Sequence, residues 1–183
     1  MKVSIVTTNE ERYLFIKKAL AQFGIETEKK PLTLDEIQAD SVNEIAVKKA
    51  LTAAKELGEP CICEDTELTI SALNGFPGPY MKFAQAKLSI EKIFSLMKDE
   101  TNRSAIFKSV LVYADQNGFS KTFDTILNGK ICNTPIGKNG KGWDSIFMIE
   151  STGKTLAEYL KEDRFALWNK GYLELGKWLS ERK

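Results

Sequence analysis

The sequence predicts a single mixed α/β domain that spans residues 1–183. Three observations indicate this fold class. Short β-branched runs alternate with segments of helical periodicity, the length suits one domain, and no repeat, low-complexity tract or linker interrupts the chain. Apolar residues make up 43% and charged residues 28% of the chain, which is typical of a soluble globular protein.

The chain opens with a strand, a turn and a helix. Residues 2–7 (KVSIVT) are mostly β-branched or apolar and predict a strand. From Glu10 onward, apolar residues recur every three or four positions, which predicts a helix that ends at Gly24. We then expect a short strand near residues 25–31 and a second helix over residues 42–57.

The middle of the chain is expected to be rich in strands. Pro60 leads an apolar strand that meets Glu64 and Asp65, and residues 74–80 (NGFPGPY) predict a rigid loop. The sequence D-Q-N-G at residues 115–118 is a hairpin signal between two β-rich stretches. The remaining expected elements are a helix near 88–98, strands over 104–114 and 120–132, a short strand at 144–149 and an amphipathic helix over 163–181.

Composition excludes several classes of chemistry. The chain contains no histidine, so Ser–His–Asp and Cys–His catalysis and the common zinc sites are excluded. Acid–base chemistry must come from other side chains or from water on a hard metal ion. The formal net charge is +1, which creates no overall attraction to nucleic acid or to a membrane.

Cysteine usage and the N-terminus indicate a cytoplasmic location. Cys61, Cys63 and Cys132 form an odd set without zinc-ligand spacing, and we expect reduced thiols. The N-terminus turns polar at Thr7, too early for a signal peptide. No apolar run approaches the roughly 20 residues that cross a bilayer. We therefore expect a soluble cytoplasmic protein that binds neither membrane nor nucleic acid.

The first turn is a candidate phosphate site. A strand that leads into a helix leaves free backbone N–H groups at the helix N-terminus, where the helix dipole favours an anion. Thr8 and Asn9 can donate hydrogen bonds there, and Arg12 follows one turn later on the same face. These residues suit a triphosphate. The alternative is that Thr8 or Asn9 only caps the helix.

Acidic residues supply a candidate metal site. Asp65 follows an apolar strand, so we expect its carboxylate at the strand's carboxyl end, where ligands gather in open α/β sheets. Glu36 is a second candidate. Carboxylates suit Mg²⁺, which takes one or two of them and completes its shell with water and phosphate oxygens. The alternative is a capping Asp65 and a solvated Glu36.

Two later segments are candidates for contact with a nucleoside. The loop G-K-N-G-K-G-W-D ends in Trp143 and Asp144, which can stack on a base or hydrogen-bond to it. Arg164, Asn169 and Lys170 on the last expected helix can reach phosphate or base. The alternatives are a core role for Trp143 and a solvated charged helix face.

The order of these segments along the chain resembles that of a known protein family. The stretch from Glu64 to Lys82 (EDTELTISALNGFPGPYMK) resembles E-D-T-x-L-x-x-x-A-L-x-G-x-P-G-P-Y-x-K, a motif of the inosine triphosphate pyrophosphatase or Ham1-like family. The resemblance extends almost from end to end. Further similar segments are Thr7-Thr-Asn-x-x-Arg12 with T-G-N-x-x-K, Glu36-Ile-Gln38 with E-I-Q, Gly142-Trp-Asp-Ser-Ile-Phe147 with F-G-[YW]-D-P-x-F after its first residue, and Thr155-Leu-Ala-Glu158 with T-x-A-E.

The resemblance implies a fold, a reaction and a set of residues. The fold would be an elongated mixed sheet flanked by helices, with two lobes around a central nucleotide groove, in a homodimer. The reaction would hydrolyse nucleoside triphosphates such as ITP, dITP and XTP to the monophosphate and diphosphate. By position, Glu36 and Asp65 would be catalytic and hold Mg²⁺, and Asp65 would orient or deprotonate the attacking water. Thr8, Asn9, Arg12 and Lys49 would hold the triphosphate, and Trp143, Asp144, Arg164, Asn169 and Lys170 would line the nucleoside pocket.

The sequence departs from the family pattern mainly in the base-reading residues. The family's aromatic residue before Gly-Trp-Asp is Lys141 here, and its S-H-R run falls on Trp168-Asn169-Lys170. At the opening, Thr8 replaces glycine and Arg12 replaces lysine. We hypothesise that the reaction is kept while the base preference has changed, with Trp168 offering a stacking face to the base. The alternative is that Trp168 packs in the core.

Two other functions stay open. One is the same chemistry on a different modified or pyrimidine triphosphate, as in the structurally related Maf pyrophosphatases, although the opening lacks their S-P-R-R turn. The other is an inactive nucleotide-binding protein. The presence of Glu36, Lys49, Asp65 and a cation at position 12 disfavours that function.

Overall fold

The computed structural model describes residues 1–182 and confirms the mixed α/β fold class. Within these residues, seven strands form one sheet in the order β2-β1-β3-β5-β6-β7, with β4 paired to β3. Their bounds are β1 (Lys2–Val6), β2 (Glu26–Lys30), β3 (Cys61–Ile70), β4 (Pro77–Gly78), β5 (Ser104–Ala114), β6 (Ser120–Ile131) and β7 (Phe147–Ile149). β1 runs parallel to β2 and β3, whereas β4 and β7 pair in antiparallel fashion.

The chain divides into two compact units. The first contains residues 1–65, 109–125 and the chain from Trp168 onward, and the second contains residues 66–108 and 126–167. β3, β5 and β6 each contribute residues to both units.

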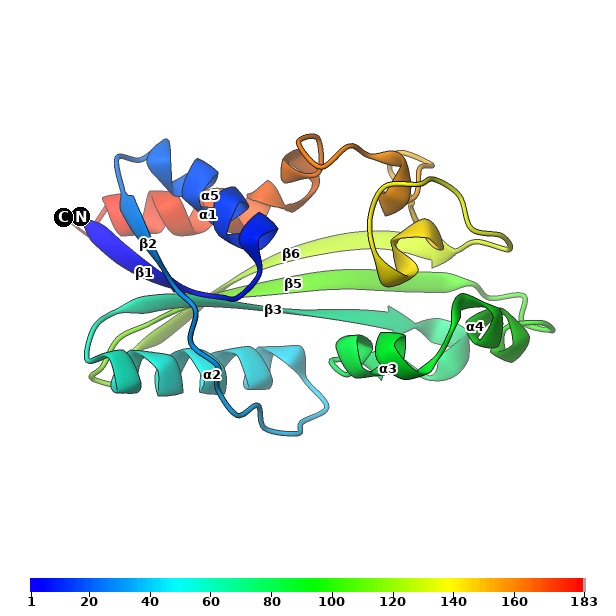
Figure 1. Cartoon of the computed structure of the whole chain (residues 1–183), viewed down its shortest axis with the longest axis horizontal. Helices are drawn as coiled ribbons and strands as arrows, with labels where there is room; N and C mark the ends of the chain where they lie inside the picture. Colours follow the sequence, from blue (N-terminus) through cyan, green and yellow to red (C-terminus); the bar gives the residue numbers. More distant parts are fainter. Residues whose placement is uncertain (183) are drawn as a thin grey trace. The chain divides into compact units, whose positions relative to one another are not determined.

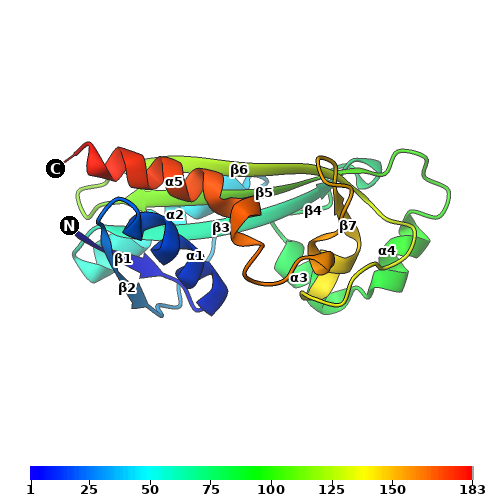
Figure 2. The same cartoon turned by 90° about the horizontal axis from the view of Figure 1, so that it is seen from above.

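Three helices belong wholly or mainly to the first unit: α1 (Glu10–Ala21), α2 (Val42–Leu57) and α5 (Phe165–Ser180). α2 covers one face of this unit's strands, and α1 and α5 cover the other (Figures 1 and 2). The face of α2 that meets the sheet is built from small residues, which lets the helix approach closely. Its fully buried residues are Ala46, Ala50, Ala53 and Ala54, and they pack with Cys61, Cys63, Val110 and Val112.

The edge of the sheet in the first unit is β2, and its register with β1 pairs Lys2 with Glu26 and Ser4 with Glu28. The Glu28 carboxylate accepts ion pairs from Lys2 at 2.6 Å and from Lys30 at 2.9 Å. β1 ends at Val6, and the structure pairs it with β3 at Cys61 and Ile62. The turn after β1 therefore lies beside the next residues of β3, Glu64 among them.

The second unit holds two short helices, α3 (Met81–Lys87) and α4 (Ile90–Leu96). They cover one face of this unit's strands, and the segment after β6 covers the other (Figure 1). The Arg103 guanidinium ties the segments together because it donates to the carbonyls of Met97, Ile131 and Cys132 at 3.1, 2.8 and 2.9 Å.

Two expectations about elements were wrong in detail, the end of β3 and the start of β7. The strand expected to meet Asp65 continues to Ile70, since Leu68 and Ile70 extend its buried face, so Asp65 lies in mid-strand. The helix expected near 88–98 is present as α4, and Leu88, whose backbone angles are extended, separates it from α3, which was not expected. β7 begins at Phe147, since Gly142–Ser145 form a 3₁₀ turn instead of strand.

The expected helix over 42–57 and the hairpin at 115–118 are confirmed. All three cysteines are buried free thiols. Across residues 1–182, no helix combines the length and the apolar character that a membrane crossing requires.

Candidate active site

The first unit brings two predicted carboxylates together around one lysine. The Lys49 ammonium, on α2, donates to Glu36 Oε1 at 2.6 Å and to Asp65 Oδ2 at 3.3 Å. Asp65 comes from β3, and Glu36 from the segment before α2. Leu32 and Leu34 pack that segment onto the α2 core. Three side chains that are far apart in the sequence thus converge on one position.

The Lys49 ammonium stays charged in this setting. Burial alone would lower the pKa of Lys49, but the nearby Asp65 and Glu36 carboxylates outweigh it and raise the pKa above its ordinary value. A permanently charged lysine is suited to binding phosphate oxygens as a point charge.

These carboxylates also fit a magnesium ion. Glu36 and Asp65 are hard oxygen donors that already share one cation, and Mg²⁺ needs one or two carboxylates. In the described part of the chain, no group of three or more acidic, histidine or cysteine side chains gathers as a complete metal cage. A magnesium ion held by Glu36 and Asp65 alone would keep coordination positions for phosphate and water.

Arg12, on α1, is anchored twice to one residue of β3. Its Nη1 donates to the Glu64 carbonyl at 2.9 Å, and its Nε forms an ion pair with Glu64 Oε2 at 3.1 Å. Because neighbouring residues of a strand point to opposite faces, Glu64 contacts Arg12 of α1 and Tyr172 of α5, while Asp65 contacts Lys49 of α2. The Glu64–Asp65 pair therefore positions two cations, Arg12 and Lys49, close enough for the charge of Arg12 to act on Lys49.

Glu64 is a buried carboxylate, 5% exposed, and hydroxyl groups complete its partners. The Tyr172 hydroxyl of α5 lies 3.0 Å from Oε1 and 3.2 Å from Oε2, and Ser109 Oγ of β5 donates to Oε1. Glu64 was not among the residues predicted for the site. Its place beside Asp65 at the start of the E-D-T motif was the available signal.

The first turn is capped as the alternative reading expected. Asn9 Oδ1 accepts a hydrogen bond from the Arg12 backbone N–H at 3.2 Å, and Thr7 Oγ1 accepts one from the Asn9 N–H at 3.1 Å. Thr8 and Asn9 are both exposed. This cap fixes the start of α1, and with it the backbone position from which Arg12 extends.

The second unit contains a separate polar group. Asp144 Oδ2 accepts a hydrogen bond from the Lys141 backbone N–H at 2.9 Å and an ion pair from Arg164 Nη1 at 3.1 Å. Gly140 takes a φ of +109°, and a Cβ at that position would meet Arg164 Nη2 and Asp144 Oδ2 at 2.5 Å each. Glycine is therefore required for the loop to lie so close to this ion pair.

Arg164 has donors without acceptors. The residue is 9% exposed, and its buried Nε and Nη2 have no hydrogen-bond partner within residues 1–182. An unsatisfied buried donor costs about 1–3 kcal/mol, so such groups usually have a functional reason. Trp143, adjacent to Asp144, is 2% exposed.

Comparison with known proteins agrees with this arrangement. A model of the Ham1 family matches residues 3–170. The chain belongs to the Ham1 family. It is 42% identical over 164 residues to a dITP/XTP pyrophosphatase of Methanopyrus kandleri, covering 90% of this chain and 87% of the relative. It is 35% identical over 187 residues to an inosine triphosphate pyrophosphatase of Candida glabrata, covering 97% of both. The solved structure of a HAM1 protein from Coxiella burnetii matches with a TM-score of 0.89 and 26% identity, covering 99% of each chain.

The resemblance drawn from residues 64–82 is thereby confirmed, as are the fold class and the relation to triphosphate pyrophosphatases. In this Ham1 family member, the last group of predicted residues lies in the first unit, on α5. Trp168 and Asn169 are half-buried and Lys170 is exposed. The Trp168 carbonyl accepts a hydrogen bond from Thr125 Oγ1 at 3.3 Å, which holds the start of this helix segment on β6.

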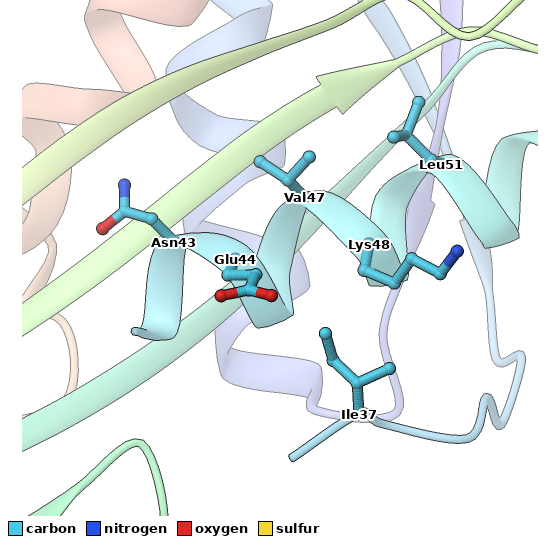
Figure 3. A pocket seen from close by; sticks show the side chains of 6 residues that line it. All are labelled: Ile37, Asn43, Glu44, Val47, Lys48 and Leu51. Atoms are coloured by element: carbon cyan, nitrogen blue, oxygen red, sulfur yellow. The ribbon is translucent and has the colours of Figure 1, made fainter. Parts of the chain in front are cut away.

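An open hollow of about 390 Å³ lies along α2 of this Ham1 chain (Figure 3). Figure 3 shows Ile37, from the segment before α2, facing Val47 and Lys48. The hollow is lined by Ile37, Asn43, Glu44, Val47, Lys48 and Leu51. None of these is a predicted site residue, so the hollow is not part of the candidate active site.

Because Tyr172 is buried, we expect the free energy of unfolding to fall at alkaline pH. Burial, and then the Glu64 charge, raise the pKa of Tyr172 well above its ordinary value of 10.0. At a pH between the ordinary pKa of the unfolded tyrosine and the raised pKa of the folded one, unfolding releases a proton. The contribution of Tyr172 to the free energy of unfolding is therefore complete below pH 10 and falls as pH rises. We expect the free energy of unfolding, measured in urea, to fall more steeply above about pH 10 in the parent than in Tyr172→Phe, by up to ~1.4 kcal/mol per pH unit. Equal slopes would contradict this.

Proposed function

We propose that this chain hydrolyses a nucleoside triphosphate to the monophosphate and diphosphate. The observation that carries the proposal is the convergence of Glu36, Lys49 and Asp65 at contact distance in the first unit. Reactions at phosphate require mainly positioning and neutralisation of charge, and these residues offer both without histidine. Relatives named dITP/XTP pyrophosphatase and inosine triphosphate pyrophosphatase support the same reaction.

In this proposal Glu36 and Asp65 hold Mg²⁺, which supplies neutralisation of phosphate charge when bound. Asp65 also orients the attacking water and accepts its proton while the water oxygen bonds to the α-phosphorus. The bond between the α-phosphorus and the bridging oxygen breaks, and diphosphate leaves. Lys49 and Arg12 bind the negative oxygens of the triphosphate, together with Thr8 and Asn9 in the first turn.

For the base, we propose a deaminated purine, as in ITP, dITP or XTP, in place of the changed preference hypothesised from Trp168, Asn169 and Lys170. The buried Nε and Nη2 of Arg164 are donors that need acceptors. Hypoxanthine and xanthine present a carbonyl oxygen where adenine presents an amino group, so adenine would leave a donor facing a donor. A site built in this way rejects the wrong base strongly, because its buried groups stay unpaired.

The other proposed nucleoside contacts are less constrained. Asp144 holds one nitrogen of the Arg164 guanidinium, and the neighbouring Trp143 is buried, so we propose both as nucleoside contacts. Trp168, which is half-buried, offers a face for stacking on the base. Asn169 and Lys170 follow it on α5 and contact base or phosphate.

We also propose a cytoplasmic homodimer. Phe76, Tyr80 and Phe83 in the second unit are 40%, 39% and 67% exposed, and such apolar surface suits an interface between copies. Light scattering that gives a monomer mass at working concentration would contradict the dimer.

The three buried free thiols fit a reducing compartment, which cell fractionation would check.

The test is diphosphate release by the full chain across a panel of triphosphates, with and without Mg²⁺. We expect Mg²⁺-dependent turnover of ITP, dITP and XTP, with kcat/KM on the order of 100-fold above that for ATP. Turnover that favours a pyrimidine or another modified triphosphate would keep the reaction and replace the substrate. Release from none of them would contradict the proposed function and favour a binding protein.

A further inference from the structure

One buried residue of α5 has a place in this network without any assigned role. Tyr172 is 3% exposed, and its hydroxyl meets both carboxylate oxygens of Glu64, which lies 108 positions earlier in the sequence. Ser109 from β5 donates to the same carboxylate. All of these residues belong to the first unit.

The directions of these hydrogen bonds are fixed by chemistry. An ionised carboxylate only accepts, so both hydroxyls must donate to Glu64. Tyr172 stays protonated for this purpose because burial and the Glu64 charge raise its pKa well above the ordinary value. With two hydroxyl donors on it, the Glu64 carboxylate has a single orientation.

That orientation determines where the Arg12 guanidinium lies. Nε is held by Glu64 Oε2 and Nη1 by the Glu64 carbonyl, so two edges of the fork are fixed to one residue. The third nitrogen, Nη2, makes no hydrogen bond or ion pair to any residue between 1 and 182. The Arg12 side chain is 21% exposed, and since Nε and Nη1 face Glu64, we infer that Nη2 is the nitrogen an anion can reach.

Arginine makes this arrangement possible. A lysine has one point-like ammonium, which would have to share its donors between Glu64 and a ligand at a single position. The planar guanidinium separates the two tasks, since one edge binds the protein and the other remains for phosphate. The departure from lysine at position 12 thereby gains a structural reason.

We propose that Tyr172 is a positioning residue for triphosphate binding, acting through Glu64 on Arg12. Ser109 is its partner in the same role. This inference rests on the proposed function, because it assigns Arg12 to the triphosphate. It concerns affinity for the phosphate chain, whatever the base.

The test compares Tyr172→Phe with the parent and with Tyr113→Phe. Tyr113 belongs to the same unit, and its ring contacts Phe119 and Trp178, so this control removes a hydroxyl away from Glu64. We expect Tyr172→Phe to raise KM roughly 10-fold while kcat changes less than about 3-fold. Binding of inorganic tripolyphosphate, measured by calorimetry, should weaken by the same factor, and Tyr113→Phe should change neither quantity.

A double-mutant cycle separates positioning from general structure. In an Arg12→Ala background, Tyr172→Phe should cause no further loss of tripolyphosphate affinity, because its effect acts through Arg12. An equal loss in both backgrounds, or an unchanged affinity in Tyr172→Phe, would overturn the proposal. If Tyr172→Phe does not fold at the assay temperature, Ser109→Ala removes the other hydroxyl and the same comparison decides.

The binding measurement also keeps the two proposals distinct. Calorimetry with tripolyphosphate requires no turnover, so it tests the role of Tyr172 even in a protein that releases no diphosphate. Absence of diphosphate release with intact tripolyphosphate binding would contradict the proposed function alone. Normal release combined with an inert Tyr172→Phe would contradict the positioning role alone.

Discussion

Asp65→Asn is expected to reduce diphosphate release at least ~1,000-fold in kcat/KM, because the amide can neither accept the proton of water nor offer a carboxylate to a hard metal ion. The side chains are nearly isosteric, and Asp65 lies in mid-strand on β3, so the fold should be retained. Loss of the carboxylate also breaks the ion pair between Asp65 and the Lys49 ammonium. The ion pair between Lys49 and Glu36 remains. Steady-state release of diphosphate from the preferred triphosphate measures the effect.

Asp40→Asn is the matched control, because it makes the same change at an exposed residue of the segment before α2. It should keep kcat/KM within about 2-fold of the parent, since surface changes away from a site have small effects. Near-normal turnover by Asp65→Asn would remove Asp65 from the catalytic role and would turn attention to Glu36.

The second large effect concerns two arginines of the second unit that differ in how their donors are satisfied. Arg103 donates to three carbonyls at 2.8 to 3.1 Å, so Arg103→Met leaves three acceptors without their partner. We expect a loss of about 3 kcal/mol in the free energy of unfolding. Arg164→Met breaks one ion pair, to Asp144 at 3.1 Å, but it also removes two buried donors that have no acceptor, so its loss should be smaller than that of Arg103→Met.

Urea unfolding of the unliganded proteins measures both changes. We expect the variant with the smaller loss of stability to show the larger change in substrate preference. Arg164→Met should abolish discrimination between ITP and ATP, whereas Arg103→Met should retain it below its unfolding temperature. If Arg164→Met proved as destabilising as Arg103→Met, the unsatisfied donors would have a structural role and the proposed contact with the base would lose its support.

Local sequence patterns predicted most elements of the fold because those elements are determined locally. Helix α2 has its apolar residues at helical spacing and ends at Gly58, whose φ is +68°, so its bounds are as expected. The extension of β3 to Ile70 was missed, because the polar residues Glu64–Glu67 resemble the end of a strand. They are tolerated within the sheet since Glu64 and Asp65 each meet a cation.

The candidate site was less accessible to sequence reasoning. Types of residue in a familiar order indicated Asp65 and Lys49, whose proximity the structure then shows. The connection from Arg12 through Glu64 to Tyr172 joins α1, β3 and α5, and no periodicity links positions so far apart. Only the packing of both helices on the same face of the sheet brings them together.

The charged edge formed by β2 has a consequence for how copies of the protein can meet. Hydrogen bonds from Lys2 and then Lys30 lower the pKa of Glu28 to about 2, so this residue keeps its charge even in acid. An incoming strand that tried to extend the sheet there would have to strip water from an ionised cluster, which natural edge strands use to resist aggregation. We therefore expect copies of the protein to associate through a surface other than β2.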